Sequence, residues 1–119
     1  MPTESSLSWT KETAATAITS TSSAATIEGL PALGYVSVQI TSAALSATIT
    51  FEVTNNGTDW ASIELLPSTD LLDTALTATA TANGLFVSRD PIACTSFRAK
   101  CSAFTSQTTA FMTARWARV

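Results

Sequence analysis

FEVTNNGTDW, residues 51–60, is the stretch of the sequence that decides the fold. Before its turn, apolar Phe51 and Val53 alternate with polar residues, and a second alternation follows over residues 61–65. A period of two is typical of a strand that buries one face. Between the two runs, Asn56-Gly57 supplies the positive φ angles that a tight hairpin requires. The stretch therefore predicts two antiparallel strands joined by a turn.

The same alternation continues outward from this hairpin along most of the chain. Further strands are expected at residues 14–18, 24–27, 35–41, 77–82, 85–87, 97–103 and 109–118. Many short strands separated by regular turn signals are typical of a sandwich or barrel. We expect an all-β fold, an antiparallel β-sandwich or jelly roll of about eight strands. Residues 14–119 would form this single domain, and residues 1–13 an N-terminal arm.

The amino-acid composition argues against most kinds of enzyme catalysis. Of the 119 residues, 45% are hydrophobic, 13% are charged and none is His. Without an imidazole, the commonest general base and metal ligand are missing. Glu52 with Glu64, and Asp70 with Asp73, lie among Thr and Ser at expected solvent-facing positions, whereas glycoside hydrolysis needs one acid in an apolar pocket. We expect no enzyme, no catalytic residue, no metal site and no cofactor.

The net charge and the cysteine spacing limit which partners the protein can bind and the compartment in which it is made. The net charge of −3 argues against a protein that coats nucleic acid. No apolar run approaches the roughly 20 residues of a membrane helix, and no secretory signal follows Met1, so we expect a soluble product made in the cytoplasm, bound to no membrane. Cys94 and Cys101 lie too far apart along one extended strand for a disulfide, so both are expected to be buried reduced thiols.

The charges are distributed unevenly along the chain. Up to residue 88, Lys11 is the one cation against eight acidic residues, whereas from Arg89 onward five cations accompany Asp90 alone. Complementary patches of this kind can pair like molecules head to tail. The alternative is that strand pairing mixes the charges over one surface.

Three segments carry a resemblance to known proteins: the hairpin over residues 51–60, Gly84-Leu85-Phe86-Val87, and Ser96-Phe97-Arg98-Ala99-Lys100-Cys101-Ser102-Ala103-Phe104-Thr105-Ser106. In this order they resemble an N/D-G-T-x-W hairpin, a G-L-Y/F segment and an F-R-V-R-V-S-A-Y-T-S-G stretch. Those features occur in small β-sandwich proteins encoded among the structural genes of tailed bacteriophages. The similarity extends over residues 35–111 and leaves the arm unmatched.

This resemblance implies a virion component with a jelly-roll-like fold. Similar modules serve as head decoration proteins and as parts of tail or fibre proteins, and their fold is similar to that of carbohydrate-binding modules. Lys100, Cys101 and Gln107 differ from the usual Arg, Val and Gly of such sequences.

The first hypothesis is a capsid decoration or cement subunit that binds the outside of a phage head and stabilises it. Its location would be the virion, and its partners would be the major capsid protein and itself, as a dimer or trimer. The candidate capsid contacts in and near the arm are Leu7, Trp9, Lys11 and Ile18. The candidate subunit-interface residues are Arg98, Lys100, Phe111, Arg115 and Trp116.

Two features of the last strands support that interface. The final strand carries Ala110, Met112, Ala114 and Trp116 on one face and Phe111 on the other, which indicates a partner on each face. Arg98, Lys100 and Arg115 would form a basic stripe, or else be solvated cations that prevent edge pairing.

The second hypothesis is a tail or fibre module that binds host carbohydrate. Tyr35, Trp60 and Phe104 are then the aromatic rings that would stack on a sugar. For Trp60, capping the end of the core is the alternative role.

Overall fold

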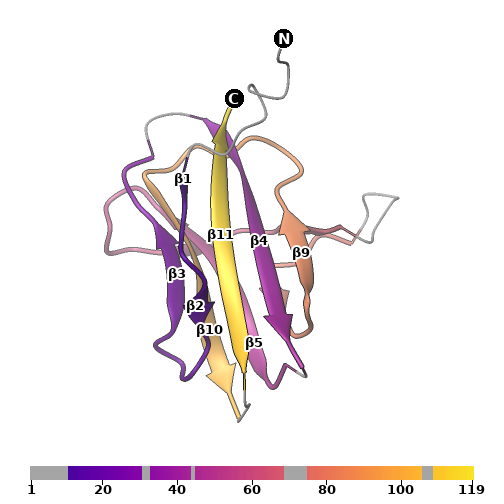
Figure 1. Cartoon of the computed structure of the whole chain (residues 1–119). Helices are drawn as coiled ribbons and strands as arrows, with labels where there is room; N and C mark the ends of the chain where they lie inside the picture. The colour runs from indigo at the N-terminus through magenta and orange to yellow at the C-terminus, as the bar shows by residue number, and fades with distance from the viewer. Residues whose placement is uncertain (1–10, 31–32, 44, 69–74, 106–108) are drawn as a thin grey trace.

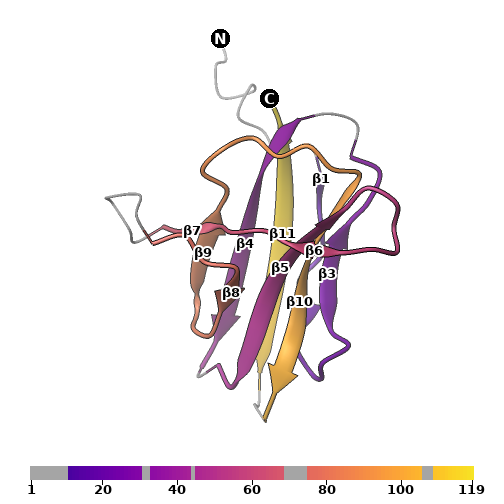
Figure 2. The same ribbon diagram turned by 180° about the vertical axis from the view of Figure 1, so that it is seen from behind.

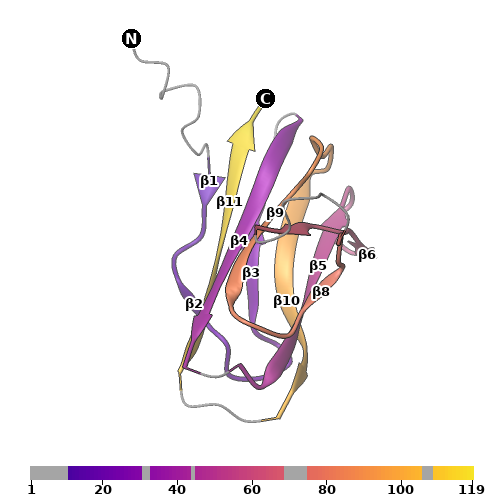
Figure 3. The ribbon, with the colours of Figure 1, turned by 90° about the vertical axis from the view of Figure 1, so that its right-hand side faces the viewer.

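The computed structural model describes residues 11–30, 33–43, 45–68, 75–105 and 109–119. Within these residues the chain forms eleven strands and no helix, and the strands build two antiparallel sheets that pack face to face (Figure 3). The expected all-β sandwich is therefore confirmed. The described part of the chain contains no helix with the length and apolarity needed to cross a membrane.

The six-stranded sheet lies in front in Figure 1. It contains β1 (Lys11–Glu12), β2 (Thr16–Ala17), β4 (Gly34–Ser42), β7 (Leu66–Pro67), β9 (Gly84–Val87) and β11 (Ala110–Arg118). Its order is β1-β11-β4-β9-β7, and β2 also pairs with β11. The paired part of the chain thus includes Lys11 and Glu12, which lie within the range expected as an arm.

The five-stranded sheet lies in front in Figure 2. It contains β3 (Ala24–Ile27), β5 (Ala47–Thr54), β6 (Ala61–Ser62), β8 (Thr79–Ala80) and β10 (Ser96–Phe104). Its order is β3-β10-β5-β6, and β8 also pairs with β5.

The connectivity is that of a jelly roll once the interrupted edges are joined. If β1 with β2, and β6 with β8, each count as one broken strand, the chain passes between the two sheets in jelly-roll order. The count exceeds the expected eight because the edge strands pair over two residues at a time. The strands predicted at residues 61–65 and 77–82 are therefore shorter in the structure, as β6 and β8. Leu65 and Thr77 pair with each other only in an isolated bridge outside these two strands.

The core lies between the sheets and is filled from both. Its largest fully buried side chains include Trp116, Phe51, Phe97, Ile40 and Ile49. Strict alternation in β4 and β11 sends every second side chain inward, as the sequence predicted.

One departure from that alternation occurs in β10. Simple alternation over the predicted strand at residues 97–103 places Ala103 on the same side as Phe97, but the register against β5 shifts between Cys101 and Ala103. Such a bulge inserts one unpaired residue and reverses the sides of those that follow. Ala103 is consequently exposed, and Phe104 packs against the core instead.

The predicted hairpin is present, but its turn is wider than the expected tight one. β5 pairs with β6 at Val53 and Ala61, so residues 54–60 form the connection. Asn56 organises it, because its side-chain oxygen accepts hydrogen bonds from the backbone N–H groups of Thr58 and Asp59 at 2.9 and 2.8 Å. Gly57 has the positive φ, at 82°.

Candidate interaction surfaces

The outer side of the six-stranded sheet, here called the six-stranded face, carries Tyr35 and Phe111, two of the four large apolar residues that are exposed in the described part of the chain. Its members are Tyr35, Ser37, Gln39 and Thr41 from β4, Leu85 and Val87 from β9, and Phe111, Thr113, Arg115 and Ala117 from β11. Tyr35 is 41% exposed and Phe111 is 38% exposed. The two rings lie at opposite ends of the paired strands, since Tyr35 is opposite Ala117 and Phe111 is opposite Thr41.

The Tyr35 end of this face continues into two more apolar side chains. The Val119 N–H donates to the Leu33 carbonyl at 3.0 Å, so these residues extend the β4–β11 ladder beyond Tyr35. Leu33 is 48% exposed and Val119 is 69% exposed. We call Leu33, Tyr35, Ala117 and Val119 the terminal patch.

The Phe111 end borders an apolar pocket of about 230 Å³. Its lining residues are Ala17, Ile18, Thr19, Phe104, Thr109, Ala110 and Phe111, and none is charged. Between the two ends lies a smaller hollow of about 130 Å³, lined by Ser37, Gln39, Leu85, Thr113 and Arg115. The Arg115 guanidinium there is ion-paired with Glu12 of β1 at 3.0 Å.

The outer side of the five-stranded sheet is polar. Its strands present Thr26, Thr48, Thr50, Glu52, Ser62, Thr79, Arg98, Lys100 and Ser102. Arg98 donates to Glu52 at 2.6 Å, and its guanidinium lies 4.0 Å from the centroid of the Trp60 ring. The Lys100 ammonium donates to the Thr21 carbonyl at 2.6 Å.

The predicted basic stripe is not formed. Arg98 and Lys100 belong to the five-stranded sheet, whereas Arg115 belongs to the other, so the cations lie on opposite sides of the sandwich. Arg98 and Arg115 are each paired with an acid from the amino-terminal half, Glu52 and Glu12. Strand pairing therefore mixes the two charge populations, as the alternative interpretation expected.

Two candidate contact residues are core residues. Trp116 has no exposed surface and Ile18 is 2% exposed, because both side chains point between the sheets. The prediction that Ile18 contacts the capsid and the prediction that Trp116 lies at a subunit interface are both wrong for this reason. Lys11 is exposed on β1, and Leu7 and Trp9 lie outside the described residues.

The aromatic side chains proposed for sugar stacking have three different surroundings. Arg98 covers one face of the half-buried Trp60 ring. Phe104 is half-buried and packs against the core. Tyr35 has the most open ring of the three, on the six-stranded face.

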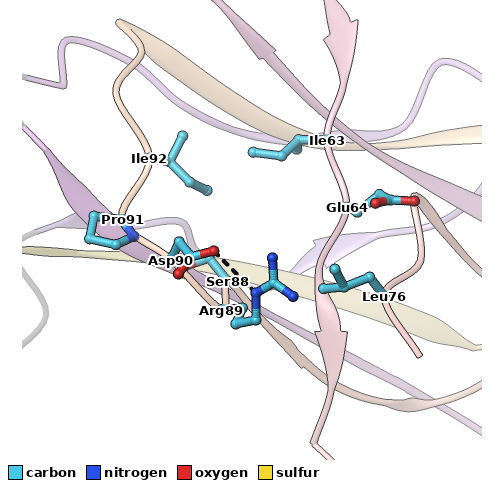
Figure 4. Close-up of a pocket in the computed structure, with 8 residues that line it drawn as sticks. All are labelled: Ile63, Glu64, Leu76, Ser88, Arg89, Asp90, Pro91 and Ile92. Carbon is cyan, nitrogen blue, oxygen red and sulfur yellow. Dashed lines mark hydrogen bonds and ion pairs between the residues drawn. The ribbon is translucent and has the colours of Figure 1, made fainter. Parts of the chain in front are cut away.

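A further pocket of about 260 Å³ opens between the segment after β9 and the segment after β6. Ile63, Leu76 and Ile92 form its apolar part, and Glu64 lies on its rim; Figure 4 shows Arg89 paired with Asp90 at 3.1 Å. Glu64 and Asp90 are both exposed to water.

Cys94 and Cys101 are buried free thiols, as predicted. Burial raises the pKa of both thiols, which keeps them protonated and unreactive. Among the residues that the structure describes, no three His, Cys, Asp or Glu side chains gather where a metal ion could bind.

The sequence did not predict that Leu33 and Val119 are exposed apolar residues at one end of the six-stranded face, nor that a hollow lies beside Leu85. Leu33 and Val119 lie just outside the predicted strands, so the alternation within those strands did not assign them to a face. The hollow is formed by residues of β4, β9 and β11 together, and a local sequence pattern does not show which strands are neighbours. The one usable signal was the apolar Val at position 119 after a fully alternating strand.

No family model and no curated protein matches the chain. Among solved structures, the fold is similar to the crystal structure of the SPBc2 prophage-derived protein YomS, with a TM-score of 0.68. The similar region covers 89% of this chain and 93% of that one, with 16% sequence identity. At this identity the likeness shows a shared fold.

Proposed function

We propose that the chain is a structural component of a phage virion, a decoration or cement subunit that binds the outside of the head. Three observations support this. Residues 35–111 resemble small structural proteins of tailed phages, the fold is similar to that of a prophage-derived protein, and the exposed apolar side chains suit adhesion. The protein would act by binding alone, without a reaction.

The observation that carries the proposal is the way in which the base of the arm is attached. The Thr13 N–H donates to the Ala114 carbonyl at 2.9 Å, and the Ala114 N–H donates to the Thr13 hydroxyl at 3.0 Å. Beside them, Glu12 is ion-paired with Arg115 at 3.0 Å. Because β11 is an inner strand, between β1 and β4, tension on residues 1–10 would be transferred into the middle of a sheet.

Such an attachment suits a strap across joints between capsid subunits. Leu7 and Trp9 are the apolar side chains that the strap would bury there. Opening of the lattice would then require the loss of these contacts as well, which stabilises the closed head by mass action. Several arms acting together would hold even if each contact were weak.

Deletion of residues 1–10, tested by mixing with undecorated heads of the encoding phage, examines this role. The deletion stops before β1, so the Glu12–Arg115 pair and the sandwich remain. We expect the full chain to sediment with the heads, and the shortened chain to bind at least about ten-fold more weakly.

A full-length pair of variants refines this experiment. Leu7→Ala with Trp9→Ala should behave as the deletion does, whereas the matched control Ser5→Ala with Ser8→Ala should bind as the full chain does. Equal binding by the deleted chain, or no binding by the full chain, would overturn the proposal.

Carbohydrate binding is the second candidate, favoured by the open ring of Tyr35. A glycan array distinguishes the two. If the chain is a decoration subunit, no saccharide on the array should bind in a way that depends on Tyr35. A saccharide that binds the wild type but not the Tyr35→Ala variant would instead indicate a tail or fibre module.

A further inference from the structure

The two outer faces of the sandwich differ in what they present to solvent. The five-stranded face presents mainly Thr, Ser and charged side chains, and Arg98 covers its half-buried Trp60 ring, as expected for an antiparallel sheet with one side in water. The six-stranded face instead presents the exposed Tyr35 and Phe111 and the half-buried Leu85, Val87 and Ala117 around one ion pair. An exposed surface that combines apolar side chains with few charges is typical of a protein–protein interface.

We propose that the six-stranded face binds the same face of a second copy in a two-fold dimer, with the axis crossing the strands at Ser37 and Arg115. These two residues are opposite each other at the middle of the β4–β11 ladder. On one side of them lies the pair Tyr35 and Ala117, and on the other side lies Gln39 with Thr113. Rotation about this axis places the first pair of each copy over the second pair of the other copy.

The arrangement places a protruding ring over a matching hollow. The hollow of about 130 Å³ lies on the Gln39 side of the axis, where the Tyr35 ring of the second copy would arrive. Leu85 and the Arg115 stem offer apolar contact to the ring, and Gln39 offers a hydrogen-bond partner for its hydroxyl.

The next row of residues fits in the same way. One step farther from the axis, Leu33 and Val119 of one copy would meet Phe111 and its apolar pocket on the other. A single two-fold rotation thus covers, in both copies, the terminal patch and the Phe111 end of the six-stranded face. This is the self-complementarity that an isologous interface requires.

Charge and area are compatible with a reversible dimer. At the axis the Arg115 side chains of the two copies face each other, as do the two Glu12 side chains, so these like charges are offset only by the ion pair within each copy, at 3.0 Å. β4 and β11 have nine residues each, so the face is about 30 Å long, and its four central strands give a width of about 19 Å. About 600 Å² per copy, or about 1,200 Å² in total, lies at the lower end for specific interfaces.

Cysteine cross-linking tests the register directly. In the variant with Tyr35→Cys and Gln39→Cys, the two new thiols lie on one strand about 13 Å apart, too far for a disulfide within one copy. In the dimer each would face the other thiol of the second copy. The matched control is Thr26→Cys with Ser62→Cys on the five-stranded face, where the two positions lie about 14 Å apart across three strand spacings.

We expect mild oxidation to convert the first variant to a covalent dimer on a non-reducing gel, and to leave the control monomeric. In light scattering, the wild-type mass should rise with concentration from 12.4 kDa towards twice that value. Tyr35→Ala should weaken the dimer about ten-fold or more with unchanged thermal unfolding, whereas Tyr35→Phe should weaken it less than about three-fold.

A wild-type protein that stays monomeric at millimolar concentration, or a control pair that cross-links as fast as the face pair, would overturn the dimer. Because these experiments contain no phage heads, failure of the dimer leaves the head-binding result unaffected, and the reverse holds too.

Discussion

Replacement of Gly34 by Ala is expected to destabilise the sandwich by about 3 kcal/mol. A Cβ atom at this position would clash with Cε2 of Trp116, and would lie 2.5 Å from Cζ2 of the same ring and 2.6 Å from the Ala117 carbonyl oxygen. Ordinary carbon–carbon contacts lie at about 3.5–4.0 Å. The Trp116 ring is fully buried, so it has no free space to move into. Overpacking typically costs about 1–3 kcal/mol, and two obstacles, one of them backbone, indicate the upper end.

Urea unfolding at equilibrium measures this cost, with the m-value showing whether the denatured state has changed. A loss of about 3 kcal/mol should lower the melting temperature by about 10 °C in a domain of this size. Gly57→Ala is the comparison, because a Cβ there meets nothing within 4 Å and carries only the cost of its φ of +82°, about 1 kcal/mol. A Gly34→Ala variant within about 0.5 kcal/mol of the wild type would refute the packing argument.

Two further predictions concern the buried thiols of Cys94 and Cys101 and the half-buried ion pair of Arg98 with Glu52. Because burial raises the pKa of both thiols above the ordinary value of 9.0, their contribution to the free energy of unfolding should be complete below pH 9.0 and be lost as the pH rises through the higher folded-state pKa values. Urea midpoints between about pH 8 and about pH 10 measure this loss; it should be smaller when Cys94 and Cys101 are both Ala, and an equal loss would contradict the assignment. Arg98→Ala should cost about 1–2 kcal/mol, since Glu52 loses its partner at 2.6 Å and Trp60 loses its covering cation. Arg98→Lys should recover only part of this loss in the same urea experiment, and full recovery would show that stacking contributes nothing.

The long strands could be predicted from the sequence because each carries its own signal. Over β4 and β11, the alternation of apolar and polar residues sets which side chains point inward, and the structure confirms it for Val36, Val38 and Met112. The short edge strands carry no such signal. β2 and β8 pair over two residues each, and their extent depends on neighbouring strands that a local pattern does not specify.

The candidate surfaces could be predicted only in part, because a strand pattern does not say which sheet the strand joins. Trp116 was correctly placed on the face opposite Phe111, yet that face meets the other sheet rather than a second subunit. For the same reason Arg98 and Arg115 looked like one stripe although they lie in different sheets. The bulge after Cys101 could not be predicted either, because it arises from pairing with β5.

The proposed decoration role is best tested by cryo-electron microscopy of purified particles of the phage that is proposed to encode the chain. We expect density for the two-sheet sandwich on the outer surface of the head, with the amino-terminal end of β1 directed towards the capsid lattice. Particles whose heads carry no such density, or in which the sandwich occurs only at the tail, would contradict it.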